Sequence, residues 1–161
     1  YKGLYHPSAM KQQARWKAHP DQISRISKFF TIMGDFLWNE FDGTFYAKAQ
    51  NLGRKYKEYY DEMLNKYDIL IMPTVPIRAP KQVSDPTMFI SYAEKAVGNF
   101  ANTAIFNVTG HPAFSIPVAM VNDLPIGMTI ISKHFHEATI YQAAYAWEQA
   151  YDWKKNEHSL E

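Results

Sequence analysis

Three histidines and a glutamate in the second half of the chain have the types and spacing that could support chemistry. His111 lies between a glycine and a proline, where an imidazole could act as a general base. His134, His136 and Glu137 lie close together and could supply metal ligands. A simpler interpretation is favoured for both. His111 has no neighbouring Asp or Ser in the sequence and suits a structural turn. His134, His136 and Glu137 suit a solvated loop leading into the last helix, where residues two apart tend to point to opposite sides.

Nucleophilic catalysis within the chain has little support. A self-sufficient hydrolase would have to combine His111 with Ser115, but no residue is expected to orient the histidine, and Pro117 constrains the strand. The chain has no cysteine, which excludes disulfides, thiolate metal sites and a cysteine nucleophile. It also lacks a phosphate-binding loop, a dinucleotide-binding turn and a paired-histidine zinc motif. We therefore expect no catalytic residue, no metal ligand and no cofactor in this chain.

The composition is that of a folded domain. The 161 residues are 47% hydrophobic and 16% aromatic, enough to bury a core. The 17 basic and 16 acidic residues nearly cancel, which argues against a nucleic-acid or anionic-membrane partner. No apolar run approaches the roughly 20 residues of a membrane span. The absence of cysteines fits the cytosol, and we expect a cytoplasmic protein. Because the first residue is Tyr1 and not Met, we expect the chain to be processed, trimmed or partly ordered.

Residues 1–66 show helical periodicity. A short helix is expected from about Ala9 to Ala18, ending at His19-Pro20 because a residue before proline disfavours helix. A second helix is predicted over about Gln22 to Phe41, and Thr44 could cap a third. The second helix has an apolar face of Ile23, Ile26, Phe30, Met33 and Leu37. The third has an apolar stripe, interpreted as core packing rather than a ligand surface, of Phe45, Ala49, Leu52, Tyr56, Tyr59 and Met63.

Residues 67–161 contain the expected strands. The apolar run Asp68–Pro73 suits a strand buried on both faces of a sheet. A proline-rich loop and a helix over Thr87 to about Ala101 follow. Phe114–Met120 and Gly127–Ser132 are predicted to form adjacent strands around a turn. A final helix from about Glu137 to Trp153 has the apolar face Ile140, Ala143, Ala144, Trp147 and Tyr151.

This order of elements indicates part of an α/β layered domain. Three strands are too few for a complete sheet of that kind. A truncated sheet would leave an unpaired edge and exposed apolar surface, which folded proteins avoid. We therefore expect a partner segment to supply the remaining strands.

Five segments, in this order, resemble the amidase signature family. They are Tyr67–Pro76 (YDILIMPTVP), Asn102–Ala113 (NTAIFNVTGHPA), Ser115–Pro117 (SIP), Leu124–Met128 (LPIGM) and His134–Thr139 (HFHEAT). Each is weak alone, but the ordered set is specific from about Tyr67 to the C-terminus and looser from Tyr5 to Lys66. Within this family, the sequence especially resembles the amidases that hydrolyse aliphatic and aromatic amides and are associated with nitrile metabolism.

The resemblance implies the C-terminal part of an α/β/α layered fold with a mixed central sheet. Residues 1–66 would be a helical segment and residues 67–161 a strand-containing segment of one amidase domain. Family members hydrolyse amides to acid and ammonia through a Ser–cis-Ser–Lys triad and an acyl-enzyme, with backbone N–H groups stabilising the oxyanion. The triad lies in the family's N-terminal half, and no serine of this chain matches it. The resemblance therefore assigns no catalytic residue here.

The resemblance does imply substrate contacts. Residues entering the NT…TG-x-PA segment approach the substrate in the family, which corresponds here to Phe100, Asn102 and Thr103. The family's glutamine-specific tRNA amidotransferases have an acidic residue at the position of Phe100. A phenyl ring cannot pair with an ammonium group, so the substrate is expected to carry an apolar acyl group. The alternative is that Phe100 packs against its own helix.

Two interpretations of the whole chain remain open at this point. In one, it is part of an amidase whose N-terminal segment carries the triad, with a small-molecule amide as substrate and a homodimer as one further possibility. In the other, it is an orphan fragment acting as a binding or structural module. Alone, the chain is expected to be inactive.

Overall fold

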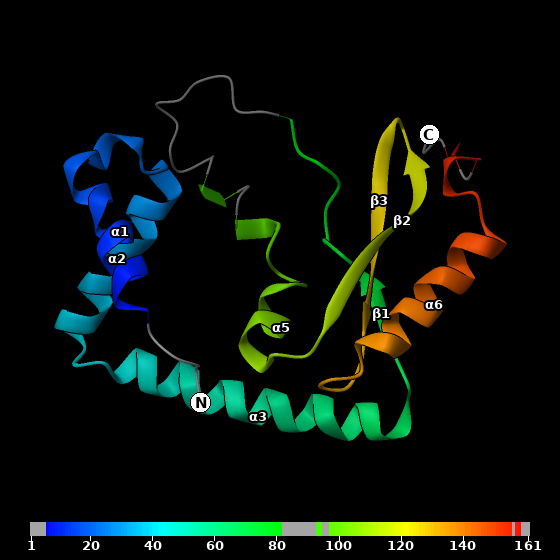
Figure 1. Ribbon diagram of the computed structural model, residues 1–161, viewed down its shortest axis with the longest axis horizontal. Coiled ribbons are helices and arrows are strands. Elements are labelled where there is room, and N and C mark those ends of the chain that lie inside the picture. Colours follow the sequence, from blue (N-terminus) through cyan, green and yellow to red (C-terminus); the bar gives the residue numbers. More distant parts are fainter. Residues whose placement is uncertain (1–5, 82–92, 95–96, 156, 159–161) are drawn as a thin grey trace. The chain divides into compact units, whose positions relative to one another are not determined.

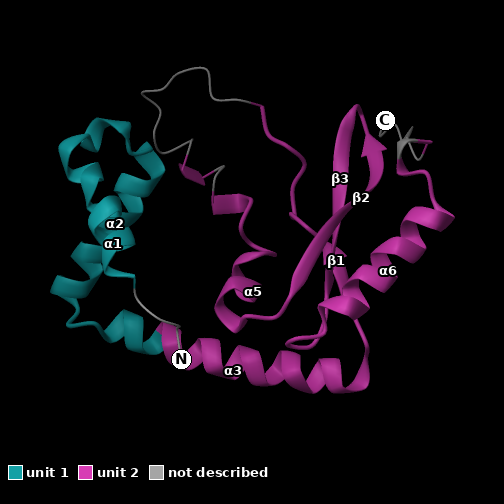
Figure 2. Ribbon diagram, in the orientation of Figure 1, with its two compact units in different colours: residues 1–48 teal, residues 49–161 magenta. Residues whose placement is uncertain are grey.

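A computed structural model of the chain describes residues 6–81, 93–94, 97–155 and 157–158. They form two compact units, residues 1–48 and residues 49–161, with the division inside a long helix (Figure 2). Among the described residues, no helix is long and apolar enough to cross a membrane.

The first unit is helical. It contains α1 (Pro7–Gln13), two short 3₁₀ helices (Ala14–Ala18 and Pro20–Gln22) and α2 (Arg25–Glu40). The predicted break at His19 is confirmed, although the first predicted helix changes to 3₁₀ geometry halfway. Ser24 caps α2 by accepting a hydrogen bond from the Ser27 N–H at 3.2 Å.

Helix α3 (Thr44–Lys66) contains the division between the two units (Figure 2). Its first helical hydrogen bond runs from the Ala47 N–H to the Gly43 carbonyl at 3.0 Å. Gly43 therefore occupies the N-cap position predicted for Thr44.

The predicted core role of the α3 stripe is wrong for this chain. Its large members are 43% to 52% exposed: Phe45, Leu52, Tyr56, Tyr59 and Met63. The buried residues of α3 are Gly53 and Leu64, and Tyr60 packs beside Leu64. Apolar periodicity identified an apolar face of α3. It did not identify the face that the rest of this chain buries, which is the one with Gly53 and Leu64.

The second unit is built around a sheet with the strand order β1-β3-β2-β4. The strands are β1 (Leu70–Pro73), β2 (Ala113–Val121), β3 (Leu124–Ile131) and β4 (Glu157–His158). The first three pair antiparallel, and the two-residue β4 pairs parallel to β2. The predicted hairpin is confirmed: Asn122 and Asp123 both have left-handed backbone, as a tight two-residue turn requires.

Helices cover both faces of this sheet (Figure 1). On one face α6 (Glu137–Ala150) packs through Ile140 and Ala144 against Ile116 and Ile130. On the other, Leu64 of α3 and Phe106 of α5 (Ala104–Thr109) pack against Ile131. The predicted apolar face of the last helix is confirmed as far as Trp147.

The described part of the sheet has an edge at β1. The sequence predicted β1 to be buried on both faces, but Ile71 is 61% exposed. The helix predicted over Thr87 to Ala101 lies largely outside the described residues.

Candidate functional site

The backbone around the predicted substrate residues is held firmly in place. The Phe100 carbonyl accepts hydrogen bonds from the backbone N–H groups of Thr103 and Ala104, at 3.1 and 2.8 Å. The Asn102 side-chain amide donates to the Pro73 carbonyl at 2.7 Å, which ties this turn to the end of β1. The Phe100 ring, in contrast, is 49% exposed. The turn before α5 therefore presents an aromatic ring on a fixed backbone.

A cluster of three hydroxyl groups lies at the end of β1. Thr74 Oγ1 lies 2.7 Å from Ser115 Oγ and accepts a hydrogen bond from Thr129 Oγ1 at 2.9 Å. These residues come from the segment after β1, from β2 and from β3, so sheet register brings them together. The cluster needs a glycine at position 127, because a Cβ there would lie only 2.9 Å from Thr74 Oγ1.

A pocket of about 360 Å³ lies beside this cluster. It is lined by residues 75–80, Asn99 and residues 125–127. Asn99 and Gly127 link the pocket to the Phe100 turn and to the hydroxyl cluster. Of the predicted substrate residues, none is itself part of this lining. The pocket therefore borders the predicted substrate residues without including them.

A second polar cluster lies where α3 passes the start of β2. His111 Nε2 lies 3.1 Å from Asp61 Oδ1, and His134 Nε2 lies 3.8 Å from the same oxygen. The two imidazole rings face each other with centroids 4.2 Å apart. The expectation that no residue orients His111 is wrong, because Asp61 reaches it from 50 positions away. His136 is exposed and lies outside this cluster.

The electrostatics of this cluster favour a neutral His111 beside an ionised Asp61. Burial lowers the pKa of His111, and the hydrogen bond to Asp61 opposes this effect only in part. The hydrogen bond from Lys57 lowers the pKa of Asp61, with a smaller contribution from His111. His111 therefore donates its Nε2–H to the carboxylate, and its Nδ1 accepts from Thr109 Oγ1 at 2.9 Å.

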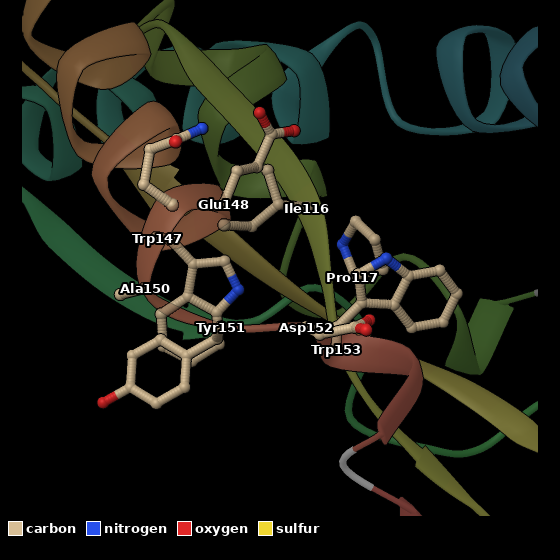
Figure 3. A pocket seen from close by; sticks show the side chains of 9 residues that line it. Ile116, Pro117, Trp147, Glu148, Ala150, Tyr151, Asp152 and Trp153 are labelled. Atoms are coloured by element: carbon tan, nitrogen blue, oxygen red, sulfur yellow. The ribbon is translucent and has the colours of Figure 1, made fainter.

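A larger pocket of about 550 Å³ lies between the end of α6 and β2 (Figure 3). Its walls include Ile116, Pro117 and the aromatic pair Trp147 and Tyr151, whose rings stack with centroids 4.4 Å apart. This pocket lies on the face of the sheet that α6 covers. The hydroxyl cluster lies on the opposite face, which α3 and α5 cover.

Comparison with known proteins identifies the family of the chain. The amidase family model matches residues 10–141. The chain belongs to the amidase family. This confirms the family predicted from the five segments of sequence.

Several relatives show how much of such a protein is present. The chain is 37% identical over 148 residues to a protein in the nthA 5' region of Rhodococcus erythropolis, covering 91% of this chain and 74% of that one. It is 35% identical over 150 residues to an enantioselective amidase of Rhodococcus rhodochrous, covering 92% of this chain but 29% of the amidase. It is 39% identical to a glutamyl-tRNA(Gln) amidotransferase subunit of a Geobacillus strain, covering 94% of this chain and 30% of that protein.

Solved structures agree on the fold. A bacterial aryl acylamidase of the amidase signature family superimposes with a TM-score of 0.59 at 20% identity, over 92% of this chain and 31% of the acylamidase. A glutamyl-tRNA(Gln) amidotransferase subunit of Thermotoga maritima gives a TM-score of 0.54 at 23% identity, over 81% and 28% of the two chains. The chain thus spans less than a third of both proteins.

Proposed function

We propose that this chain is the C-terminal part of an amidase that hydrolyses the C–N bond of a carboxylic amide to an acid and ammonia. A separate N-terminal segment would carry the Ser–cis-Ser–Lys triad and form the acyl-enzyme. The family match over residues 10–141 supports the fold and the relationship. The chain itself would position the acyl group of the substrate and complete the sheet.

Exposed apolar surface is the observation that carries the proposed partner. The α3 stripe and Ile71 of β1 leave large side chains uncovered in the described part of the chain. A stripe of four or more half-exposed aromatic and aliphatic residues on one helix face is unusual for a finished surface. An edge strand with a 61%-exposed isoleucine is also a template for further pairing. A segment that adds a strand to β1 and covers α3 would remove both exposures.

Phe100 is proposed to form part of the acyl pocket wall. Its ring is half exposed, so it is available to a substrate, while its carbonyl fixes the turn through two backbone hydrogen bonds. An aromatic wall favours an apolar acyl group because it gives contact area and no ion pair. Asn102 and Thr103 would act mainly by holding this turn against β1.

The experiment co-expresses this chain with a polypeptide carrying the serine-rich amidase signature and measures complex formation and amide hydrolysis. Intact mass of the purified complex identifies the partner, and hydrolysis is compared over aliphatic amides of increasing chain length and an aromatic amide. Phe100→Ala is expected to change the chain-length preference. Phe135→Ala is the matched control, because Phe135 is 93% exposed and lies in the loop before α6.

Two results separate the interpretations. A complex without hydrolysis of any tested amide would favour a non-catalytic binding or structural module of the same fold. An active complex in which Phe100→Ala leaves the preference unchanged would contradict the pocket assignment and leave the amidase proposal intact.

A further inference from the structure

We propose that Asp61, His111 and His134 form a binding site for a divalent transition-metal ion of the zinc type. One ligand atom from each residue lies within 4.8 Å of the other two. With metal–ligand bonds of about 2.1 Å, the ligand atoms of a tetrahedral site are roughly 3.4 Å apart. The two measured separations from Asp61 Oδ1, 3.1 Å to His111 Nε2 and 3.8 Å to His134 Nε2, lie on either side of this value.

The donor set selects the class of metal. Two imidazole nitrogens and one carboxylate oxygen suit zinc and neighbouring first-row ions. Magnesium and calcium prefer sites made of oxygen ligands, so this site should discriminate against them. Three protein ligands leave a fourth position of a tetrahedral ion for water.

His134 offers a buried ring nitrogen as the third ligand. Its Nε2 is buried, and within the described part of the chain it has no hydrogen-bond partner, since Asp61 Oδ1 is too distant at 3.8 Å. Buried polar atoms without a partner are uncommon in folded proteins and need an explanation. A metal ion between the two histidines and Asp61 would occupy the lone pair of this nitrogen.

His111 can change tautomer to accept a metal. In the metal-free cluster its Nε2–H donates to Asp61, and its Nδ1 accepts from Thr109. Metal binding requires a bare Nε2, so the proton must lie on Nδ1. The Thr109 hydroxyl can donate or accept, so it suits both tautomers. Metal-bound histidines are commonly oriented in this way by a partner on the second ring nitrogen.

Backbone contacts hold the two histidine loops together. The Ser132 N–H donates to the Pro112 carbonyl at 3.3 Å, which joins the end of β3 to the residue after His111. The fully buried Ser132 hydroxyl donates to the His136 carbonyl at 3.0 Å. A turn closed by the His136 N–H and the Lys133 carbonyl at 3.1 Å then directs His134 towards Asp61. The ligands are therefore positioned before an ion binds.

Lys57 opposes the ion but does not block it. Its ammonium group binds Asp61 Oδ2 at 2.5 Å, whereas both histidines approach Oδ1. Lys57 is 44% exposed and can move into solvent. A positive charge at this distance weakens cation binding, so removing it should strengthen the site.

The test titrates the complete chain, prepared without a polyhistidine tag, with zinc sulfate by isothermal titration calorimetry. One equivalent of zinc is expected to bind, and magnesium is expected not to. Cobalt(II) in place of zinc should give the intense visible absorption of a four-coordinate ion. His134→Ala should weaken zinc binding by more than about tenfold, and Thr109→Val by about 10- to 100-fold.

His136→Ala is the matched control, because it removes an exposed histidine two residues away and should leave the affinity unchanged. Lys57→Met should tighten binding by about threefold, the scale of an exposed ion pair. Asp61→Asn, which keeps the shape of the side chain, replaces His134→Ala if circular dichroism shows that variant to be unfolded. Absence of stoichiometric zinc binding, or equal losses in His134→Ala and His136→Ala, would overturn the site.

Discussion

Gly127 provides a quantitative test of how the β1–β3 end of the site is packed. An alanine Cβ there would lie 2.9 Å from Thr74 Oγ1 and 3.2 Å from Ser115 Oγ, both closer than ordinary contacts. Gly127→Ala must therefore displace hydroxyls that are joined by bonds of 2.7 and 2.9 Å.

The cost can be worked out from these contacts. Overpacking costs about 1–3 kcal/mol, and weakening the two hydroxyl bonds adds about 1 kcal/mol each at most. Replacing glycine stabilises by about 0.4–1 kcal/mol through the unfolded chain. We expect Gly127→Ala to lower the free energy of unfolding by about 2 kcal/mol.

Urea unfolding followed by circular dichroism measures this difference, provided that the slope against urea is unchanged. Gly34→Ala is the control, because among the described residues no atom beyond its chain neighbours and its own helix backbone lies within 4 Å of the added Cβ, and α2 should gain about 1 kcal/mol. In a Thr74→Ala background, the cost of Gly127→Ala should fall below about 1 kcal/mol. An unchanged cost in that background would refute the steric reasoning.

Three further predictions concern packing in the second unit. Ile131→Ala should lower the free energy of unfolding by about 2–5 kcal/mol, because Ile131 is fully buried. Ile71→Ala, at the exposed edge of the sheet, should change it by less than about 0.5 kcal/mol. Similar values for the two variants in urea titrations would contradict the assigned core. The Cβ added by Gly53→Ala would lie 2.8 Å from a Val108 methyl group. Gly53→Ala should therefore stabilise α3, by about 1 kcal/mol, only when Val108 is also replaced by alanine. A double-mutant cycle without coupling would refute this contact. Asn102→Ala should cost about 1 kcal/mol through loss of its 2.7 Å bond to a β1 carbonyl, and should increase amide hydrogen exchange around the turn; unchanged exchange would count against it.

Local patterns predicted the elements with strong local signals. The hairpin between β2 and β3 follows from two runs of apolar residues around Asn122-Asp123, residues that tolerate a left-handed backbone. The last helix follows from apolar residues at helical spacing, and the buried Ile140 and Ala144 confirm its inward face. Gly110 ends α5 with a left-handed backbone, which glycine adopts without strain.

The same kind of pattern was misleading on α3. Its strongest apolar stripe is exposed in this chain, while Gly53 and Leu64 form the buried face. Helical periodicity reports that a face is apolar, and it does not report which segment covers that face. The chain spans under a third of the enantioselective amidase and of the aryl acylamidase that it matches.

The sequence by itself determined the family and the approximate positions of α2, the β2–β3 hairpin and α6, because these depend on residues that are close together in the chain. Only the tertiary structure joined Asp61 to His111 and His134, and Thr74 to Ser115 and Thr129. Those groups are separated by tens of residues, and their distances depend on strand register and on helix packing against the sheet. The sequence therefore presents these histidines and hydroxyls as isolated residues, while packing brings them together in two polar clusters.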